Sequence, residues 1–95
     1  MNRTYACLSA EELIEVLEAK RNNSLREVAC VAGYVDFDND EVILFNTSHN
    51  RQIIHMSAFE TSGDGTAPDF NKFEIIDYGG TIKFGEYEAA YYALI

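Results

Sequence analysis

Two runs of β-branched and aromatic residues, joined by a short turn sequence, most constrain how this chain can fold. Residues 27–37 are apolar on both faces through much of their length, which predicts a central strand. Residues 38–40, Asp-Asn-Asp, have turn chemistry, and residues 41–45, Glu-Val-Ile-Leu-Phe, return as a second strand. The sequence therefore predicts an antiparallel β-hairpin in this half of the chain.

A second hairpin is predicted around Gly79-Gly80, because both central positions of a type I′ turn need positive φ. This turn pairs Tyr78 with Thr81 and places Ile75 opposite Phe84. Alternation along the two strands then gives one core-facing set of side chains, made of Phe73, Ile75, Ile82 and Phe84.

Helices are predicted at both ends of the chain. Ser9 and Glu12 form a capping box, which begins a helix that residues 22–24, Asn-Asn-Ser, bring to an end. Residues 86–95 repeat apolar side chains at the i, i+3, i+4, i+7 spacing of a short amphipathic helix. That spacing is set by Tyr87, Ala90, Tyr91 and Leu94.

Between the hairpins, residues 52–56 predict a third strand, and residues 52–59 suit either a strand or a short helical turn. Residues 60–69 are dense in turn-forming residues and predict an exposed loop. With 95 residues there is no room for a second domain, so residues 1–95 are expected to form one. The predicted fold is α+β, with a mainly antiparallel sheet of about five strands packed against an N-terminal and a C-terminal helix.

The charge of the chain limits its partners. Seven basic and sixteen acidic residues leave a net charge of −9, which opposes direct binding to nucleic acids and to anionic membranes. No apolar run is long enough for a membrane span, and the N-terminus lacks a secretion signal, so we expect a cytoplasmic protein. The acidity agrees with simple solubility, with a basic protein partner, or with mimicry of a nucleic acid.

No residue pattern predicts a metal, a cofactor or a catalytic site. Asp36, Asp38 and Asp40 alternate as in a calcium loop, but Glu41 and Thr47 stand where that loop needs glycine and glutamate. His49 and His55 lack any zinc-ligand spacing. Cys7 and Cys30 are expected to stay reduced, and neither has the local signature of a nucleophile. We therefore expect a protein that is not an enzyme.

The tyrosines suggest where a contact surface lies. Tyr91 and Tyr92 would point about 100° apart on a helix, so one of them is expected to face outward. Because tyrosine is enriched at interfaces, we predict a homo-oligomer, a dimer, joined through the C-terminal segment; an ordinary packing helix with exposed phenols has the same composition. The predicted interface residues are Tyr87, Tyr91, Tyr92 and Leu94.

A third interpretation is a small-ligand pocket or an active site between the sheet and residues 60–69. Its lining would come from His55, Tyr78 and Tyr87, which combine an imidazole with two phenols. No cofactor is implied by these residue types.

The run from Phe73 to Phe84, which contains Ile75-Ile76-Asp77-Tyr78-Gly79-Gly80-Thr81-Ile82, resembles the small bacterial family called domain of unknown function 2442. The resemblance covers residues 28–85. The family carries Trp-Pro in many members where this chain has Phe84-Gly85, and the capped N-terminal helix and tyrosine-rich tail are further departures. The resemblance implies an α+β interaction module in bacteria without agreed catalytic residues.

The sequence thus favours a non-catalytic bacterial accessory or interaction protein that acts through an oligomer or a protein partner. The alternatives are an acidic mimic that inhibits a nucleic-acid-binding protein, and a small-ligand-binding domain or enzyme.

Overall fold

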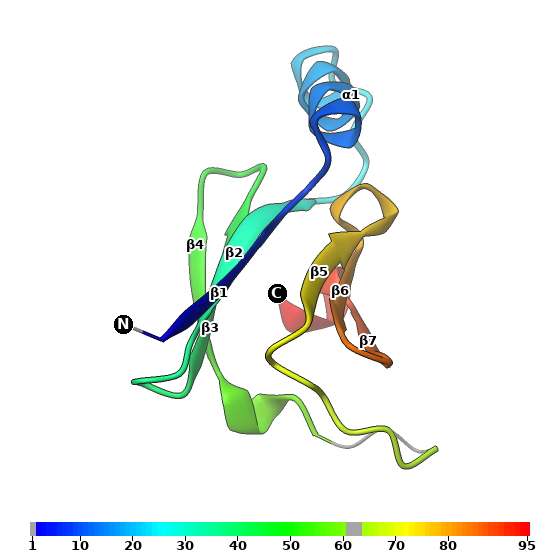
Figure 1. Cartoon of the computed structure of the whole chain (residues 1–95). Coiled ribbons are helices and arrows are strands. Elements are labelled where there is room, and N and C mark those ends of the chain that lie inside the picture. Colours follow the sequence, from blue (N-terminus) through cyan, green and yellow to red (C-terminus); the bar gives the residue numbers. More distant parts are fainter. Residues whose placement is uncertain (1, 61–63) are drawn as a thin grey trace.

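Two antiparallel sheets stacked face to face make up the molecule, as the computed structural model of residues 2–60 and 64–95 shows (Figure 1). Sheet A has the strand order β1-β2-β3-β4, and sheet B has the order β5-β6-β7. The strands of sheet A are β1 (Arg3–Cys7), β2 (Cys30–Asp36), β3 (Glu41–Asn46) and β4 (Arg51–His55). Those of sheet B are β5 (Phe73–Ile76), β6 (Thr81–Phe84) and β7 (Tyr87–Ala90).

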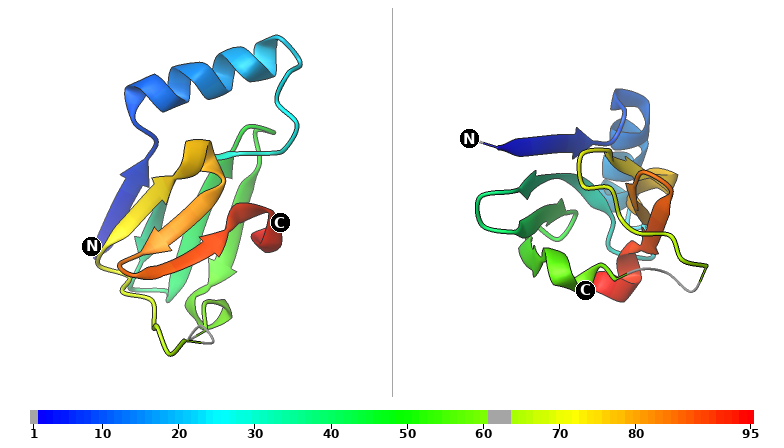
Figure 2. Two further views of the ribbon diagram at one scale, coloured as in Figure 1. Left: turned by 90° about the vertical axis from the view of Figure 1, so that its right-hand side faces the viewer. Right: turned by 60° about the horizontal axis from the view of Figure 1, so that its bottom comes forward.

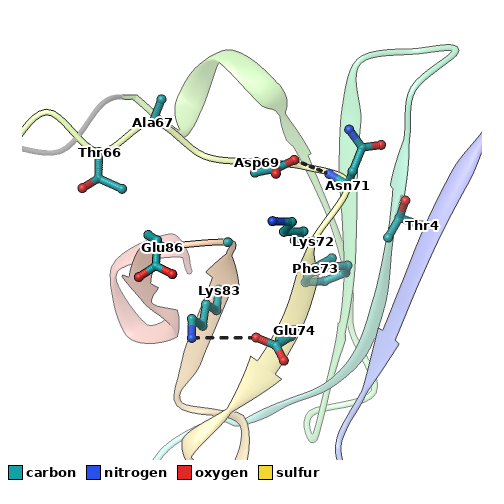
Figure 3. A pocket seen from close by; sticks show the side chains of 11 residues that line it. Thr4, Thr66, Ala67, Asp69, Asn71, Lys72, Phe73, Glu74, Lys83 and Glu86 are labelled. Carbon is teal, nitrogen blue, oxygen red and sulfur yellow. Dashed lines mark hydrogen bonds and ion pairs between the residues drawn. The ribbon is translucent and has the colours of Figure 1, made fainter.

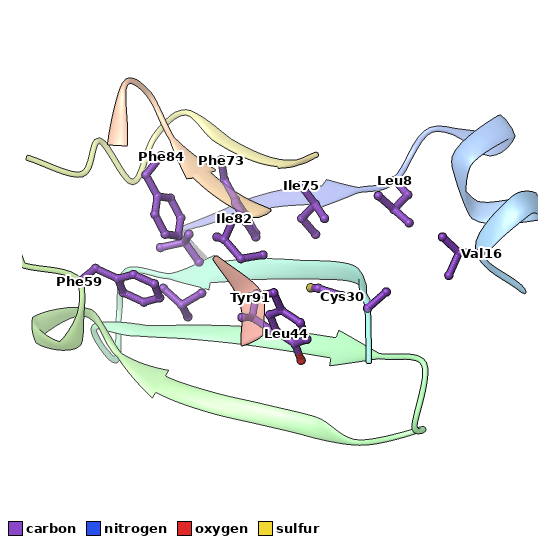
Figure 4. Packing of buried hydrophobic residues seen from close by; sticks show 13 residues of the cluster. Leu8, Val16, Cys30, Leu44, Phe59, Phe73, Ile75, Ile82, Phe84 and Tyr91 are labelled. Atoms are coloured by element: carbon purple, nitrogen blue, oxygen red, sulfur yellow. The ribbon is translucent and has the colours of Figure 1, made fainter. Parts of the chain in front are cut away.

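The core lies between the two sheets (Figure 4). Val35, Val42 and Leu44 of sheet A point into it and are completely buried. The four side chains predicted for one face of the second hairpin, Phe73, Ile75, Ile82 and Phe84, are buried opposite them. Gly33 allows the close approach, because a Cβ there would lie 3.2 Å from the Phe73 ring and 2.6 Å from the Ile43 carbonyl oxygen.

The predicted N-terminal helix is confirmed as α1 (Ala10–Arg21). The backbone N–H of Glu12 donates to Ser9 Oγ over 3.2 Å, and Asn22 is the C-cap residue. The helix lies across one end of the two sheets (Figure 2), and Val16 is its buried residue. No helix in the described part of the chain has the length and apolar run needed to span a bilayer.

The fold class is α+β with antiparallel sheets, as predicted, but the prediction of one five-stranded sheet with two helices is wrong in detail. The predicted hairpin of residues 27–45 is present as β2 and β3. The segment 52–59 contains both candidate structures, because β4 is followed directly by the 3-10 turn η1 (Met56–Ala58). Of the predicted loop 60–69, residues 61–63 lie outside the described residues, and the others form neither helix nor strand.

β1 is a strand that the sequence pattern does not reveal. It is five residues long and pairs antiparallel with β2, with Tyr5 opposite Tyr34. The whole of α1 separates the two strands, so no turn sequence marks their pairing.

The predicted C-terminal helix is wrong. Residues 87–90 form β7, and a short 3-10 turn, η3 (Tyr91–Leu94), follows. Gly85, with φ +68°, turns the chain so that Tyr87 pairs with Phe84. This pairing satisfies the second edge of β6, which a helix would leave without hydrogen-bond partners. The Tyr91 N–H then donates to the Gly80 carbonyl over 2.8 Å.

The turn of the second hairpin also differs from the prediction. Positive φ falls at Asp77, Tyr78 and Gly79, whereas Gly80 has φ −89°, so the turn is not type I′. Ile76 therefore pairs with Thr81, two residues away from the predicted register. Because side chains alternate with a period of two, this shift leaves every side chain on its predicted face.

Candidate functional site

The side of sheet A that faces away from sheet B carries the most distinctive surface of the molecule. The strand register aligns its side chains in three rows, each crossing β1, β2, β3 and β4 in that order. The central row is Tyr5, Tyr34, Ile43 and Ile53. The Cys7 row is Cys7, Ala32, Phe45 and Arg51, and the Arg3 row is Arg3, Asp36, Glu41 and His55.

We call the apolar members of these rows the outer face: Tyr5, Cys7, Ala32, Tyr34, Ile43, Phe45 and Ile53. In Figure 1, sheet B lies to the right of sheet A and α1 lies above, while the left side of sheet A is open. Tyr5 is 66% exposed, Ile53 is 53% exposed and Phe45 is 37% exposed. Ile43 is sheltered by its neighbours but lies outside the core cluster. The described chain therefore leaves the two ends of the central row, Tyr5 and Ile53, uncovered, while Ile43 between them is only 4% exposed.

Aromatic contacts within this face hold its side chains in place. The rings of Tyr5 and Tyr34 have centroids 5.6 Å apart, and those of Tyr34 and Phe45 are 6.3 Å apart. The Arg3 guanidinium lies 4.7 Å from the centroid of the Tyr34 ring, which is cation–π distance. Rigid aromatic side chains give a large contact area at low cost in conformational entropy.

The outer face is not flat. Ala32 and Cys7 have small side chains, and a shallow hollow of about 570 Å³ lies over them, between Tyr5, Tyr34 and Phe45. On the β3 and β4 side, the larger Phe45 and Ile53 stand exposed. Within the Cys7 row, the β1 and β2 positions are thus hollowed and the β3 position, Phe45, is raised.

Charged residues border the outer face. At one end, Asp36 accepts hydrogen bonds from Asn39 Nδ2 (2.9 Å) and from the Asp38 N–H (3.1 Å), so its carboxylate is held by its own hairpin turn. These bonds, the Asn39 one foremost, lower the pKa of Asp36, and the nearby Arg3 adds to the effect. At the other end, Arg51 is exposed and forms no ion pair with any described residue. An apolar centre with a charged border is the composition of a protein interface.

The four residues predicted as an interface do not share one surface. Tyr91 is completely buried, whereas Tyr92 is 68% exposed, which confirms that one of this pair faces outward. Tyr87 is partly buried, with its ring centroid 6.4 Å from that of Phe59. Leu94 is partly buried, and its carbonyl accepts a hydrogen bond from Gln52 Nε2 over 3.0 Å. The segment therefore closes the core, and only Tyr92 among these residues is widely exposed.

The three residues predicted to line a pocket lie apart. His55 Nδ1 is 2.8 Å from Ser57 Oγ, at the end of β4. Tyr78 lies beside α1. The negative charge of Glu15 on that helix is the main cause that raises the pKa of the Tyr78 phenol. Tyr87 lies at the opposite end of sheet B from Tyr78, because β6 runs between them. The structure does not bring these side chains together.

Another cleft, of about 740 Å³, lies on the outer side of sheet B (Figure 3). Two lysines and several acids line it, and Lys83 Nζ is 3.9 Å from Glu74 Oε2. The cleft is open, and its charges have both signs. It offers no buried nucleophile or base for catalysis.

The described residues contain no arrangement suited to metal binding or to nucleophilic catalysis. No group of three histidine, cysteine or acidic side chains there is placed to hold a metal ion. Both cysteines are free thiols; Cys7 is exposed and Cys30 is completely buried. Burial raises the pKa of Cys30 to about 12, so its thiol stays protonated at neutral pH.

Comparisons with protein-family models, with curated proteins and with solved structures give no match to this chain. The resemblance to the domain of unknown function 2442 family therefore stays a prediction.

Sequence reasoning missed the outer face, although one signal pointed to it. Residues 27–37 are apolar on both faces, which is typical of a strand covered on both sides. In this chain sheet B covers one side of β2, and no other layer of the described residues covers its second apolar side.

Proposed function

We propose that this chain is a non-catalytic interaction protein and that the outer face of sheet A is its binding surface. The exposed ends of the central row carry the proposal, because Tyr5 and Ile53 are each more than half exposed. Exposed apolar side chains gathered on one face and bordered by charged residues often mark a site of association. The binding surface serves another protein rather than a nucleic acid or an anionic membrane, since the chain carries a charge of −9.

Residue chemistry supports a protein partner over a small ligand. The hollow of the outer face is shallow and apolar, and it lacks the convergent polar groups that orient a small molecule. Tyrosine, phenylalanine and isoleucine surrounded by charged residues resemble the core and rim of a protein interface. A bacterial and cytoplasmic setting belongs to the same proposal.

Photo-crosslinking tests this function. A photoreactive phenylalanine analogue replaces Ile53 on the outer face or, as the matched control, Ile14 on α1, which is 57% exposed against 53% for Ile53. Each variant is illuminated inside bacterial cells that produce it. The proposal predicts a discrete protein adduct from position 53 and none from position 14. No adduct from position 53, or equal adducts from both positions, contradicts it.

A further inference from the structure

We propose that the partner of the outer face is a second copy of this chain, related to the first by a two-fold axis parallel to the strands of sheet A. The inference rests on the proposed function and names its partner. The axis passes between β2 and β3, so that β1 lies over β4 of the second copy and β2 lies over its β3. Each of the three rows then faces the same row of the second copy in reversed strand order.

The relief of the Cys7 row is self-complementary under this rotation. The hollow over Ala32 lies on the β1 and β2 half, and Phe45 stands in the same row on β3. The two-fold axis therefore brings Phe45 of the second copy over Ala32 of the first, and the reverse contact follows by symmetry. A bulky ring opposite a small side chain is the arrangement that packs two sheets together.

The central row pairs aromatic with aliphatic residues. Tyr5 faces Ile53 of the second copy, and Tyr34 faces its Ile43. These contacts cover the two most exposed side chains of the row, Tyr5 and Ile53, in a single step. Burial of this apolar area is the main driving force for the dimer.

The Arg3 row brings charged residues of the two copies together at one border of the interface. Arg3 lies on β1, and the rotation brings Glu41 of the second copy to the neighbouring strand position, over β2. Arg3 itself faces His55 of the second copy, with this Glu41 on the diagonal. The same rotation places Asp36 directly opposite this Glu41; Asp36 is only 6% exposed and its carboxylate is hydrogen-bonded within its own turn, which keeps it back from the Glu41 side chain.

The size of the face is that of a small interface. Four strands about 4.8 Å apart and three rows about 6.8 Å apart give about 400 Å² of sheet per copy. Two copies therefore bury about 800 Å², without the extra area that side chains add by standing out from the sheet. Stable interfaces bury roughly 1,200 Å² or more. The dimer should thus be weak and reversible. Added salt should strengthen it, since each copy carries a charge of −9.

Crosslinking through the native Cys7 tests both the partner and the axis. In the proposed dimer, Arg51 faces Cys7 of the second copy across the two sheets, which pack about 10 Å apart. A short bismaleimide should therefore join Arg51→Cys to Cys7 of the other copy. Both positions are exposed, so the substitution leaves the core intact.

Arg3→Cys is the control for geometry. If the two-fold axis ran perpendicular to the strands, Cys7 would face Arg3 of the second copy instead of Arg51. The wild-type chain, in which Cys30 is buried, is the control for crosslinking through Cys7 alone. The double variant Cys7→Ser with Arg51→Cys removes one end of the bridge.

The expected result is a covalent dimer from Arg51→Cys on a denaturing gel, and none from the wild type, Arg3→Cys or the double variant. A covalent dimer from Arg3→Cys, or none from Arg51→Cys although both thiols are alkylated, overturns the inference. The proposed function is tested separately, by the photo-crosslinking experiment. If photo-crosslinking at Ile53 joins the chain to a different protein, the function stands and only the second-copy inference falls.

Discussion

Asn46 on β3 donates a hydrogen bond from Nδ2 to the hydroxyl of Tyr91 in η3, over 3.0 Å. The same hydroxyl donates to Oε1 of Gln52 on β4, and the Tyr91 ring is completely buried. Through these bonds the C-terminal turn is fastened to sheet A, at the side of the sheet opposite the outer face.

Tyr91→Phe should lower the free energy of unfolding by about 1–3 kcal/mol, because it leaves the side-chain amides of Asn46 and Gln52 without their buried partner. Urea denaturation at a fixed protein concentration measures the change. Tyr92→Phe is the matched control, since Tyr92 is 68% exposed, and it should stay within about 0.5 kcal/mol of wild type. Equal stability of the two variants would show that the hydroxyl contributes nothing.

Gly79→Ala should be among the most destabilising single substitutions. A Cβ there would lie 2.3 Å from the Cys30 carbonyl oxygen and 2.9 Å from Ala29 Cβ, so backbone would have to move. Gly65→Ala isolates the conformational penalty, because Gly65 has φ +89° and no atom of the described residues lies within 4 Å of the added Cβ. We expect a loss of about 1–2 kcal/mol at Gly65 and about 3 kcal/mol or more at Gly79, measured by thermal and urea unfolding. Similar losses at both positions would contradict the close contact.

Thiol reactivity should distinguish the two cysteines. A colorimetric disulfide reagent at mildly alkaline pH should modify Cys7 in the native protein and leave Cys30 untouched, because burial raises the pKa of Cys30 to about 12. Both thiols should react after unfolding in guanidinium. Two equally fast thiols in the native state would show that the core around Cys30 is open.

Asp36 should contribute a pH-dependent part of the stability. Its native pKa lies below that of an unfolded aspartate, about 3.9, so at acidic pH the unfolded state binds the proton more readily. The stabilisation is present above that unfolded value and is lost as the pH falls through the lowered native pKa. Asp36→Asn should therefore flatten the fall of stability with acidification. Parallel curves for wild type and variant, from unfolding at a series of pH values, would rule this contribution out.

Local signals in the sequence predicted the parts of the fold that local interactions determine. The capping box of Ser9 and Glu12 marked the start of α1, and the turn chemistry of residues 38–40 marked the first hairpin. Alternation also gave the correct faces of β5 and β6, even though the turn itself was misplaced. A two-residue error in register leaves each side chain on the same face of the sheet. The core residues predicted for this hairpin are therefore correct although the turn is not.

Pairings between distant segments could not be predicted in the same way. β1 has no neighbouring turn, and its partner β2 begins on the far side of α1. Residues 87–94 have helical spacing, but the unpaired edge of β6 draws Tyr87–Ala90 into sheet B. The strand register across all four strands of sheet A creates the central row, so the outer face appears only once the complete sheet is formed.

Sedimentation equilibrium of three proteins tests most directly whether the outer face is an interface. Wild type, Ile53→Lys and Ile14→Lys differ little in fold, because both isoleucines are more than half exposed. The wild type and Ile14→Lys should show a reversible monomer–dimer equilibrium, whereas Ile53→Lys should raise the dissociation constant at least about tenfold, the cost of a charge at an apolar contact. A wild-type chain that stays monomeric to millimolar concentration, or an Ile53→Lys variant that dimerises as tightly as wild type, would contradict dimerisation through the outer face.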